Sequence, residues 1–237
     1  MVNSDTGLGE DIHQHSGWLI PLGFVLAIAT LSALFLLYYL RPVPALFRGG
    51  PTATATPVAL AIGGAHLSVP ANYIESRAAR GGGQVQTLAL FALLPDFKGY
   101  SPAEAGRFED NSPASPMVHI VLRAGAAMNS ESRLSRIYQP YMKGAGAAGP
   151  FGLDQYVFRG DSGYGNDDLF AGRRDGKLIL ILCGRPAQDL ASPDCLASER
   201  TLAPSLTLSY RFKRSRLSDW SRIDEGVTAL AAGFLRR

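Results

Sequence analysis

The stretch WLIPLGFVLAIATLSALFLLYYL, from Trp18 to Leu40, holds 23 residues and no charged side chain. A helix of that length would be roughly 34 Å long, enough to cross a hydrocarbon core of about 30 Å with a small tilt. Trp18 at its start and Tyr38 and Tyr39 near its end are residue types that favour the two membrane interfaces. We therefore expect residues 18–40 to form a transmembrane helix. The segments before and after it are interpreted relative to this helix.

The residues around this stretch differ from those of a cleaved signal peptide. Signal peptides begin with positive charge, continue with roughly 7 to 15 apolar residues and end at a cleavage site of small residues. Residues 1–17 instead carry three acidic side chains and no Lys or Arg, and the apolar run is longer and ends in Tyr-Tyr-Leu-Arg-Pro. We expect a polar tail over 1–17 and a helix retained as an anchor.

The residues after the helix divide into a linker and one domain. Residues 41–57, RPVPALFRGGPTATATP, are rich in Pro, Ala and Thr and offer no core-forming pattern, which is typical of a semi-extended spacer. Residues 58–237 are numerous enough for one domain with its own core. A hydrophobic content of 46% and a charged content of 18% exclude a disordered chain and a protein with many membrane spans.

Short apolar runs separated by turn residues predict strands over much of this domain. Gly63-Gly64 supplies the positive φ that a tight hairpin turn needs, and Asp175-Gly176 does the same later in the chain. Val85–Leu94 and Met117–Ala124 are nearly continuous apolar runs, so we expect Val85–Leu94 to occupy a central position covered on both faces. Further strands are expected in LDQYVFRG, LFAGRRDG, KLILILC and SLTLSYRF. Strict alternation in the last of these turns Leu206, Leu208, Tyr210 and Phe212 to the core and places Arg211 and Lys213 on the solvent face.

Helices are expected at three places in the domain. Ser101, Pro102 and Glu104 form a capping-box pattern at the start of a short helix, and Asn129 or Ser130 caps a mid-chain helix. Near the C-terminus, apolar residues recur every three or four positions and predict an amphipathic helix packed on the sheet. They are Leu217, Trp220, Ile223, Val227, Leu230 and Phe234. Runs of strands with helices at intervals predict an α+β domain around a mostly antiparallel sheet.

Two cysteines bear on the compartment of the domain. Cys183 ends KLILILC, and Cys195 follows after a loop of 11 residues, GRPAQDLASPD, that returns the chain towards its start. With no other cysteine in the chain to compete, this pair predicts a disulfide in an oxidising compartment. Two unrelated buried thiols are the alternative.

The positive charges next to the helix favour the opposite orientation. Arg41 and Arg48 both follow the apolar run, so the positive-inside rule alone would place the domain in the cytoplasm. Two arginines form a small bias, and long domains translocate largely regardless of charge. We therefore expect a bacterial inner-membrane protein with a cytoplasmic N-terminus and a periplasmic C-terminal domain.

Two sets of residues are candidates for contacts with partners. Small residues four apart, Gly23 with Ala27 and Ala29 with Ala33, would let another membrane helix approach closely. A basic run at the end of the domain is a candidate for contact with anionic lipid or an acidic partner protein. It consists of Arg211, Lys213, Arg214 and Arg216.

Residues 160–163, GDSG, carry the same letters that surround the nucleophile of trypsin-like proteases. The remainder of that pattern is missing, because His66 and His119 are not in an Ala-Ala-His-Cys context and Tyr164 stands where the second glycine would follow. A turn between two strands is the simpler interpretation. We identify no catalytic, cofactor-binding or metal-binding residues and expect no cofactor.

Two functional classes therefore remain. The first is a non-enzymatic binding or accessory module, anchored in the membrane lipid and associated with another membrane or envelope protein. The second is an anchored hydrolase or ligand-binding enzyme that uses the loop around Ser162. Nucleic acid is excluded as a partner, because the excess of 23 basic over 17 acidic residues after the tail is mild and scattered.

Overall fold

The computed structural model describes residues 19–39, 50–187 and 192–236. The chain forms two units, Met1–Arg48 and Gly49–Arg237, and each is described by itself. The predicted tail over 1–17 and residues 41–49 of the predicted linker lie outside the described residues. Residues 50–56 of that linker form neither helix nor strand.

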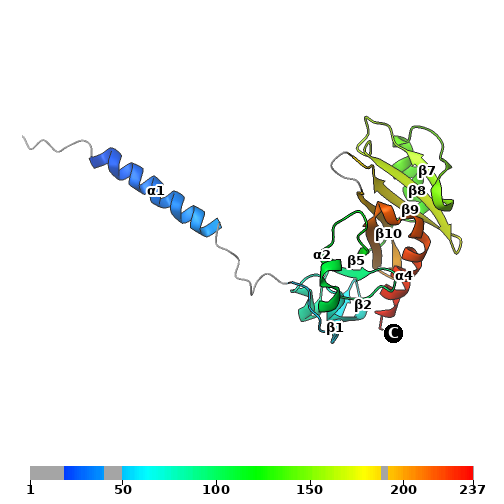
Figure 1. Cartoon of the computed structure of the whole chain (residues 1–237), viewed down its shortest axis with the longest axis horizontal. Coiled ribbons are helices and arrows are strands. Elements are labelled where there is room, and N and C mark those ends of the chain that lie inside the picture. Colours follow the sequence, from blue (N-terminus) through cyan, green and yellow to red (C-terminus); the bar gives the residue numbers. More distant parts are fainter. Residues whose placement is uncertain (1–18, 40–49, 188–191, 237) are drawn as a thin grey trace, which may run out of the picture. The chain divides into compact units, whose positions relative to one another are not determined.

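In the first unit, α1 runs from Leu19 to Tyr39, so the expected helix is confirmed as a helix (Figure 1). The hydroxyl of Thr30 donates a hydrogen bond of 2.7 Å to the Leu26 carbonyl one turn earlier. Within the described part of the chain, no helix has the length and apolarity that a membrane crossing requires. The membrane-spanning role of residues 18–40, and helix packing through Gly23, Ala27, Ala29 and Ala33, therefore stay predictions.

The second unit is an α+β domain built on a large antiparallel sheet, as the sequence predicts. Every neighbouring pair in its eight strands is antiparallel. The spatial order is β4 (Thr87–Leu93), β5 (Met117–Ala124), β11 (Leu206–Lys213), β10 (Asp194–Ala203), β9 (Lys177–Gly184), β8 (Asp167–Arg174), β7 (Asp154–Val157) and β6 (Ala147–Ala148).

A second, three-stranded sheet comes first in the domain. Strands β1 (Pro57–Ile62) and β2 (Ala65–Pro70) form the hairpin expected around Gly63-Gly64, and both glycines have positive φ. Strand β3 (Gly83–Gln84) pairs with β1 in the parallel sense. Short 3-10 helices over Ala71–Tyr73, Ala79–Gly81 and Pro150–Gly152 occupy connections.

The large sheet is covered on both faces around β8 and β9. The C-terminal helix α4 (Trp220–Gly233), which follows a 3-10 helix over Arg214–Asp219, packs on one face through Ile223 and Val227. On the other face lies the mid-chain helical segment, α3 (Ser130–Arg133) continued by a π-helix over Leu134–Tyr138 and a 3-10 helix over Gln139–Tyr141. Alternate residues of β9 therefore enter different hydrophobic clusters, which explains why KLILILC is apolar throughout.

The two expected helix caps differ in the structure. Asn129 caps α3, because its side chain accepts a hydrogen bond from the amide of Ser132. The short helix after Ser101 also exists, as a 3-10 helix over Pro102–Glu104 and α2 (Ala105–Glu109). The Ser101 side chain, however, makes no capping hydrogen bond, so the capping box is wrong.

The expected central position of Val85–Leu94 is also wrong. Strand β4 is the first in the order of the large sheet. It is apolar on both faces because Leu90 joins the main core while Phe91 packs edge-to-face against Phe108 of α2, with ring centroids 5.0 Å apart. Its outer edge bonds to the chain at Ile74 and Glu75.

The predicted disulfide is confirmed. Cys183 and Cys195 are bonded, and they face each other in register across β9 and β10. Both side chains are completely buried and belong to the hydrophobic cluster that also contains Ile223 and Val227 of α4. The cross-link therefore joins two neighbouring strands of the sheet at the point where the loop between them begins and ends.

We predict that the double variant Cys183→Ala/Cys195→Ala lowers the free energy of unfolding by about 3 kcal/mol. Without the cross-link, the 11 residues between the two cysteines gain conformational entropy in the unfolded chain. Urea unfolding of the purified full-length protein, followed by tryptophan fluorescence, measures the change. Reduction of the wild-type protein should give a similar loss. A loss below about 1 kcal/mol in both experiments would contradict a stabilising role.

Candidate functional site

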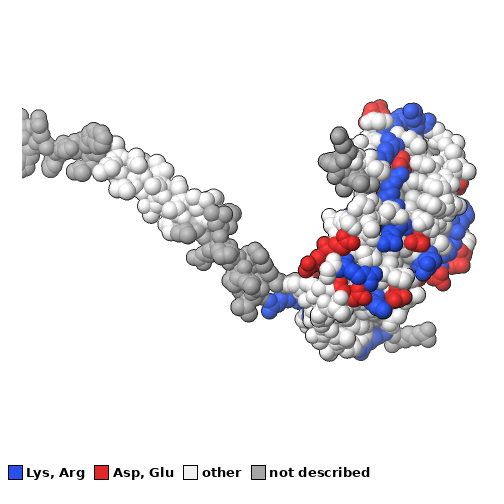
Figure 2. Space-filling model, viewed as in Figure 1, with Lys and Arg blue, Asp and Glu red and all other residues white. Residues whose placement is uncertain are grey.

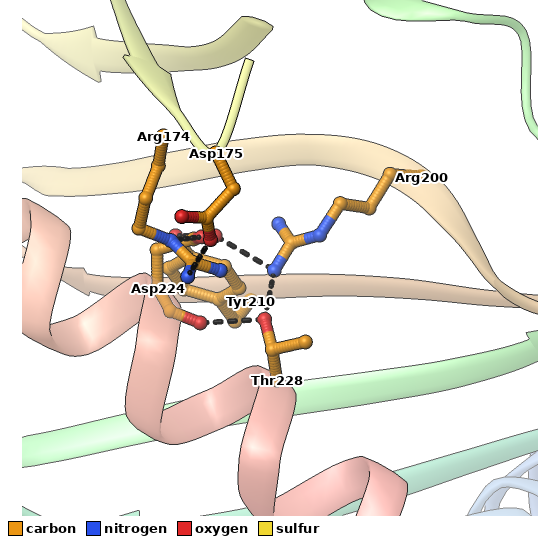
Figure 3. Close-up of polar contacts among 6 residues, drawn as sticks. All are labelled: Arg174, Asp175, Arg200, Tyr210, Asp224 and Thr228. Atoms are coloured by element: carbon orange, nitrogen blue, oxygen red, sulfur yellow. Dashed lines mark hydrogen bonds and ion pairs between the residues drawn. The ribbon is translucent and has the colours of Figure 1, made fainter. Parts of the chain in front are cut away.

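A carboxylate with no exposed surface, that of Asp224, forms the centre of the most elaborate polar cluster in the described residues. It lies on α4, directly after Ile223 of the apolar face (Figure 3). Arg174 donates from Nε to Asp224 Oδ2 over 2.7 Å. Tyr210 donates its hydroxyl to Asp224 Oδ1 over 2.9 Å, and Arg200 forms an ion pair of 2.7 Å with the same oxygen.

The donors come from three different strands of the sheet. Arg174 ends β8, Arg200 lies in β10 and Tyr210 lies in β11. Arg200 also donates to the hydroxyl of Thr228, which in turn donates to the Asp224 carbonyl one turn earlier in α4. The cluster thus joins the helix to the sheet by several directional contacts at one point (Figure 3).

Burial and charge act on the ionisable partners in opposite ways. Burial, reinforced by the charge of Asp224, raises the pKa of Tyr210 well above its ordinary value, so its hydroxyl stays protonated as a donor. Burial works to lower the pKa of Arg174, but the hydrogen bond and charge of Asp224 outweigh it and raise that pKa. Both groups therefore keep the protonation states that stabilise the buried carboxylate.

A pocket of about 500 Å³ opens beside this cluster, and we call it the polar pocket. Residues 127–131, 174–179 and 200–202 line it, together with Asp224 and Thr228. Its rim combines the exposed, apolar Met128 with Asn129, Glu131 and Lys177, so neither sign of charge dominates. One nitrogen of Arg200, Nη1, is buried without a hydrogen-bond partner in the described residues.

This arrangement suits binding rather than acid-base chemistry. A general base must come within hydrogen-bond reach of a substrate proton, whereas the Asp224 side chain is fully enclosed and already receives three donors. Tyr210 is equally enclosed. Among the described residues, no three His, Cys, Asp or Glu side chains are grouped to hold a metal ion.

The sequence contained a signal for Asp224 that the helix prediction did not use. Asp224 lies four residues after Trp220 and three before Val227, on the same face as these apolar residues. An acidic residue on a buried helical face requires compensating donors. Its partners were not predictable, because they lie 50, 24 and 14 residues away in the chain.

A second acidic residue, Asp168 of β8, organises the opposite end of this part of the sheet. Arg214 approaches Asp168 Oδ2 at 2.7 Å, donates to the Gly184 carbonyl and lies over the ring of Phe170. Arg185 donates to Asp168 Oδ1 over 2.9 Å. Arg214 is thus engaged inside the domain, next to the strand that carries Cys183.

The other members of the predicted basic run also have partners within the domain. Arg211 and Lys213 both pair with Asp194, at 3.7 and 3.1 Å, and Arg216 donates to the Ala114 carbonyl. The side chain of Arg211 is about half exposed, as the alternation of the strand predicts, whereas the predicted exposure of Lys213 is wrong, because its side chain is only 12% exposed beside Asp194. Figure 2 shows basic and acidic side chains interleaved on the face it draws. Contact of the basic run with lipid or a partner stays a prediction.

The loop around Ser162 forms a turn, as the simpler interpretation predicts. The Ser162 hydroxyl donates to the Arg159 carbonyl over 2.7 Å and accepts from the Tyr164 amide. His119 is hydrogen-bonded to Glu75 at 2.6 Å, and within the described residues neither His66 nor His119 bonds to Ser162. Among the described residues, neither histidine therefore takes the position of a base that would activate Ser162 as a nucleophile.

We predict that Asp224→Asn lowers the free energy of unfolding by about 3 to 5 kcal/mol, because two largely buried guanidinium groups lose their carboxylate while side-chain volume is kept. Asp175→Asn is the matched control, since Asp175 contacts the same Arg174 from an exposed position, and should change stability by less than about 0.5 kcal/mol. Urea unfolding measures both variants. An equal loss of unfolding free energy in the two variants would contradict the stabilising role of the buried Asp224 carboxylate.

We also predict a change in alkaline stability for Tyr210→Phe. Burial raises the pKa of Tyr210 in the folded state above the value of about 10 that a tyrosine has in the unfolded chain. The stabilisation that the protonated hydroxyl gives the folded state is therefore complete below about pH 10 and is lost as the pH rises above it. The wild-type protein should therefore lose up to about 1.4 kcal/mol more per pH unit above pH 10 than the variant. Urea unfolding between about pH 8 and 11.5 tests this, and parallel curves would refute it.

Comparisons with known proteins identify a related fold. No protein-family model matches the sequence, and no curated protein matches it significantly. Among solved structures, the chain resembles Smlt3025, an immunity protein of the Stenotrophomonas maltophilia type IV secretion system, with a TM-score of 0.56 and 17% identity over 78% of this chain and 95% of that one. It also aligns with the Neisseria meningitidis iron-regulated outer membrane lipoprotein FrpD, with a TM-score of 0.45 and 11% identity over 77% and 97% of the two chains. The first similarity shows that the domain shares the fold of Smlt3025.

Proposed function

We propose that this chain is a single-pass inner-membrane protein whose α+β domain lies in the periplasm and binds another envelope protein without catalysing a reaction. The observation that carries the proposal is the buried Cys183–Cys195 disulfide in the domain that follows 23 uncharged residues. Disulfides of this kind persist in oxidising compartments and are rare in the cytosol.

The properties of α1 support an anchor. The hydroxyl of Thr30 is satisfied by a hydrogen bond inside the helix, as a lipid environment favours. Residues 19–39 contain no charged side chain. Arg41 and Arg48 oppose the proposed orientation, but a disulfide depends directly on the compartment whereas two charges bias insertion only slightly.

The polar pocket supports the binding of a protein rather than catalysis. Met128 exposes an apolar, adaptable side chain next to hydrogen-bonding groups and charges of both signs, a mixture typical of protein contact surfaces. The shared fold with an immunity protein of a secretion system supports a role as an accessory of an envelope system. We assign the polar pocket to a segment of the partner protein.

The hydrolase alternative has less support. It requires a base beside Ser162, and the hydroxyl of that serine is instead held by backbone atoms of its own turn.

The orientation is tested with single added cysteines and a membrane-impermeant maleimide on spheroplasts. Ser218→Cys places an exposed thiol in the domain, and Ser4→Cys places one in the N-terminal tail. We predict that Ser218→Cys is labelled in intact spheroplasts and Ser4→Cys only after lysis. The wild-type protein should remain unlabelled in both samples, because its two cysteines are bonded to each other. Labelling of Ser4→Cys before lysis, with Ser218→Cys protected, would overturn the proposed topology.

A further inference from the structure

A second pocket, of about 340 Å³, is lined in part by the N-terminal turn of α4, and we call it the arginine pocket. Three guanidinium groups line it, from Arg107 of α2, Arg216 of the 3-10 helix and Arg222 of α4. Asp219 is the one acidic residue in the lining. The arginine pocket shares no lining residue with the polar pocket, and the comparisons with known proteins assign it no role.

The floor of the arginine pocket is apolar. Leu94 and Phe97 from the connection after β4, Pro116 and the fully buried Ile223 provide it. Phe97 is held in place by close packing, because a Cβ added to Gly226 would lie 1.9 Å from its ring. Phe97 also has a φ of 55°, a conformation that side chains other than glycine rarely adopt. The surrounding chain therefore fixes the ring at the pocket wall.

The arginines are positioned to different degrees. Arg107 is held by Glu104, at 2.6 Å, and by the Leu94 carbonyl, at 3.0 Å. Arg216 donates from Nη2 to the Ala114 carbonyl, while its Nε is buried without a hydrogen-bond partner. In the described part of the chain, Arg222 forms no hydrogen bond or ion pair. The lining keeps a positive excess even after the pairing of Arg107 with Glu104.

We propose that the arginine pocket binds a small organic carboxylate with an apolar body. Guanidinium groups are planar donors whose geometry matches a carboxylate, and an apolar floor at the same site favours an uncharged hydrocarbon or aromatic portion. A volume of 340 Å³ lies at the lower end of the range of small-molecule sites, which limits the ligand to a compact molecule. Arg222 recognises the carboxylate, and Phe97 contacts the body. This inference does not depend on the function proposed above.

Binding is tested with 2-naphthoate as the probe and the full-length protein in phosphatidylcholine nanodiscs, with empty nanodiscs subtracted. Titration calorimetry should show saturable binding with a Kd of about 1 mM or tighter. The neutral analogue 2-naphthylmethanol should bind about tenfold more weakly, because it lacks the charge that the arginines recognise.

Variants separate recognition from nonspecific attraction. Arg222→Gln should weaken naphthoate binding about tenfold, and Asp219→Asn should strengthen it about twofold, since it removes the opposing charge. Arg136→Gln is the matched control, because Arg136 is exposed and does not line the pocket, and its affinity should equal that of the wild type. The proposal fails if no saturable binding occurs, if the neutral analogue binds equally well, or if Arg222→Gln and Arg136→Gln behave alike.

Discussion

The buried carboxylate of Asp224 is the constraint on which the arrangement of this domain depends. An isolated charge in a protein interior costs several kcal/mol, so α4 is stable on the sheet only where donors reach Asp224. Arg174, Arg200 and Tyr210 provide them from three strands. An apolar face alone would allow the helix to slide by a turn with a modest loss, whereas directional donors from three strands select one position.

The placement of α4 in turn positions both pockets. Asp224 and Thr228 line the polar pocket, while the neighbouring residues Arg222 and Ile223 line the arginine pocket. Gly172 in β8 permits this arrangement, because an added Cβ there would lie 2.5 Å from the ring of Trp220 at the start of α4. The disulfide and the Arg214–Asp168 contact fix the sheet beneath the helix, since they connect β9, β10, β8 and the end of β11. Two candidate binding surfaces thus depend on one helix–sheet contact.

Much of the fold could be predicted from local pattern. The two glycine-containing hairpins, the alternation in Leu206–Lys213 and the apolar spacing of the C-terminal helix each reflect a short-range rule and agree with the structure. Strand β10 was missed because irregular pairing between Ala197 and Arg200, and again before Ala203, interrupts its period of two. The edge position of β4 was hidden because both of its faces are apolar: Leu90 joins the main core and Phe91 packs against Phe108 of α2.

The candidate sites were less accessible to sequence reasoning. The disulfide was predictable because only one pairing of two cysteines exists. The basic run was recognised, but its engagement within the domain by Asp168, Asp194 and Ala114 depends on contacts between distant segments. Both pockets arise in the same way, from loops that meet only in the folded domain.

The claim that the domain binds an envelope protein is tested most directly by site-specific photocrosslinking in living cells. A photoreactive phenylalanine analogue replaces Met128 at the rim of the polar pocket, and, in a matched strain, Phe151, which is similarly exposed but does not line that pocket. We predict one discrete protein adduct from position 128, in the membrane fraction, and none of that size from position 151. Absence of an adduct at 128, or the same adducts at both positions, would contradict it.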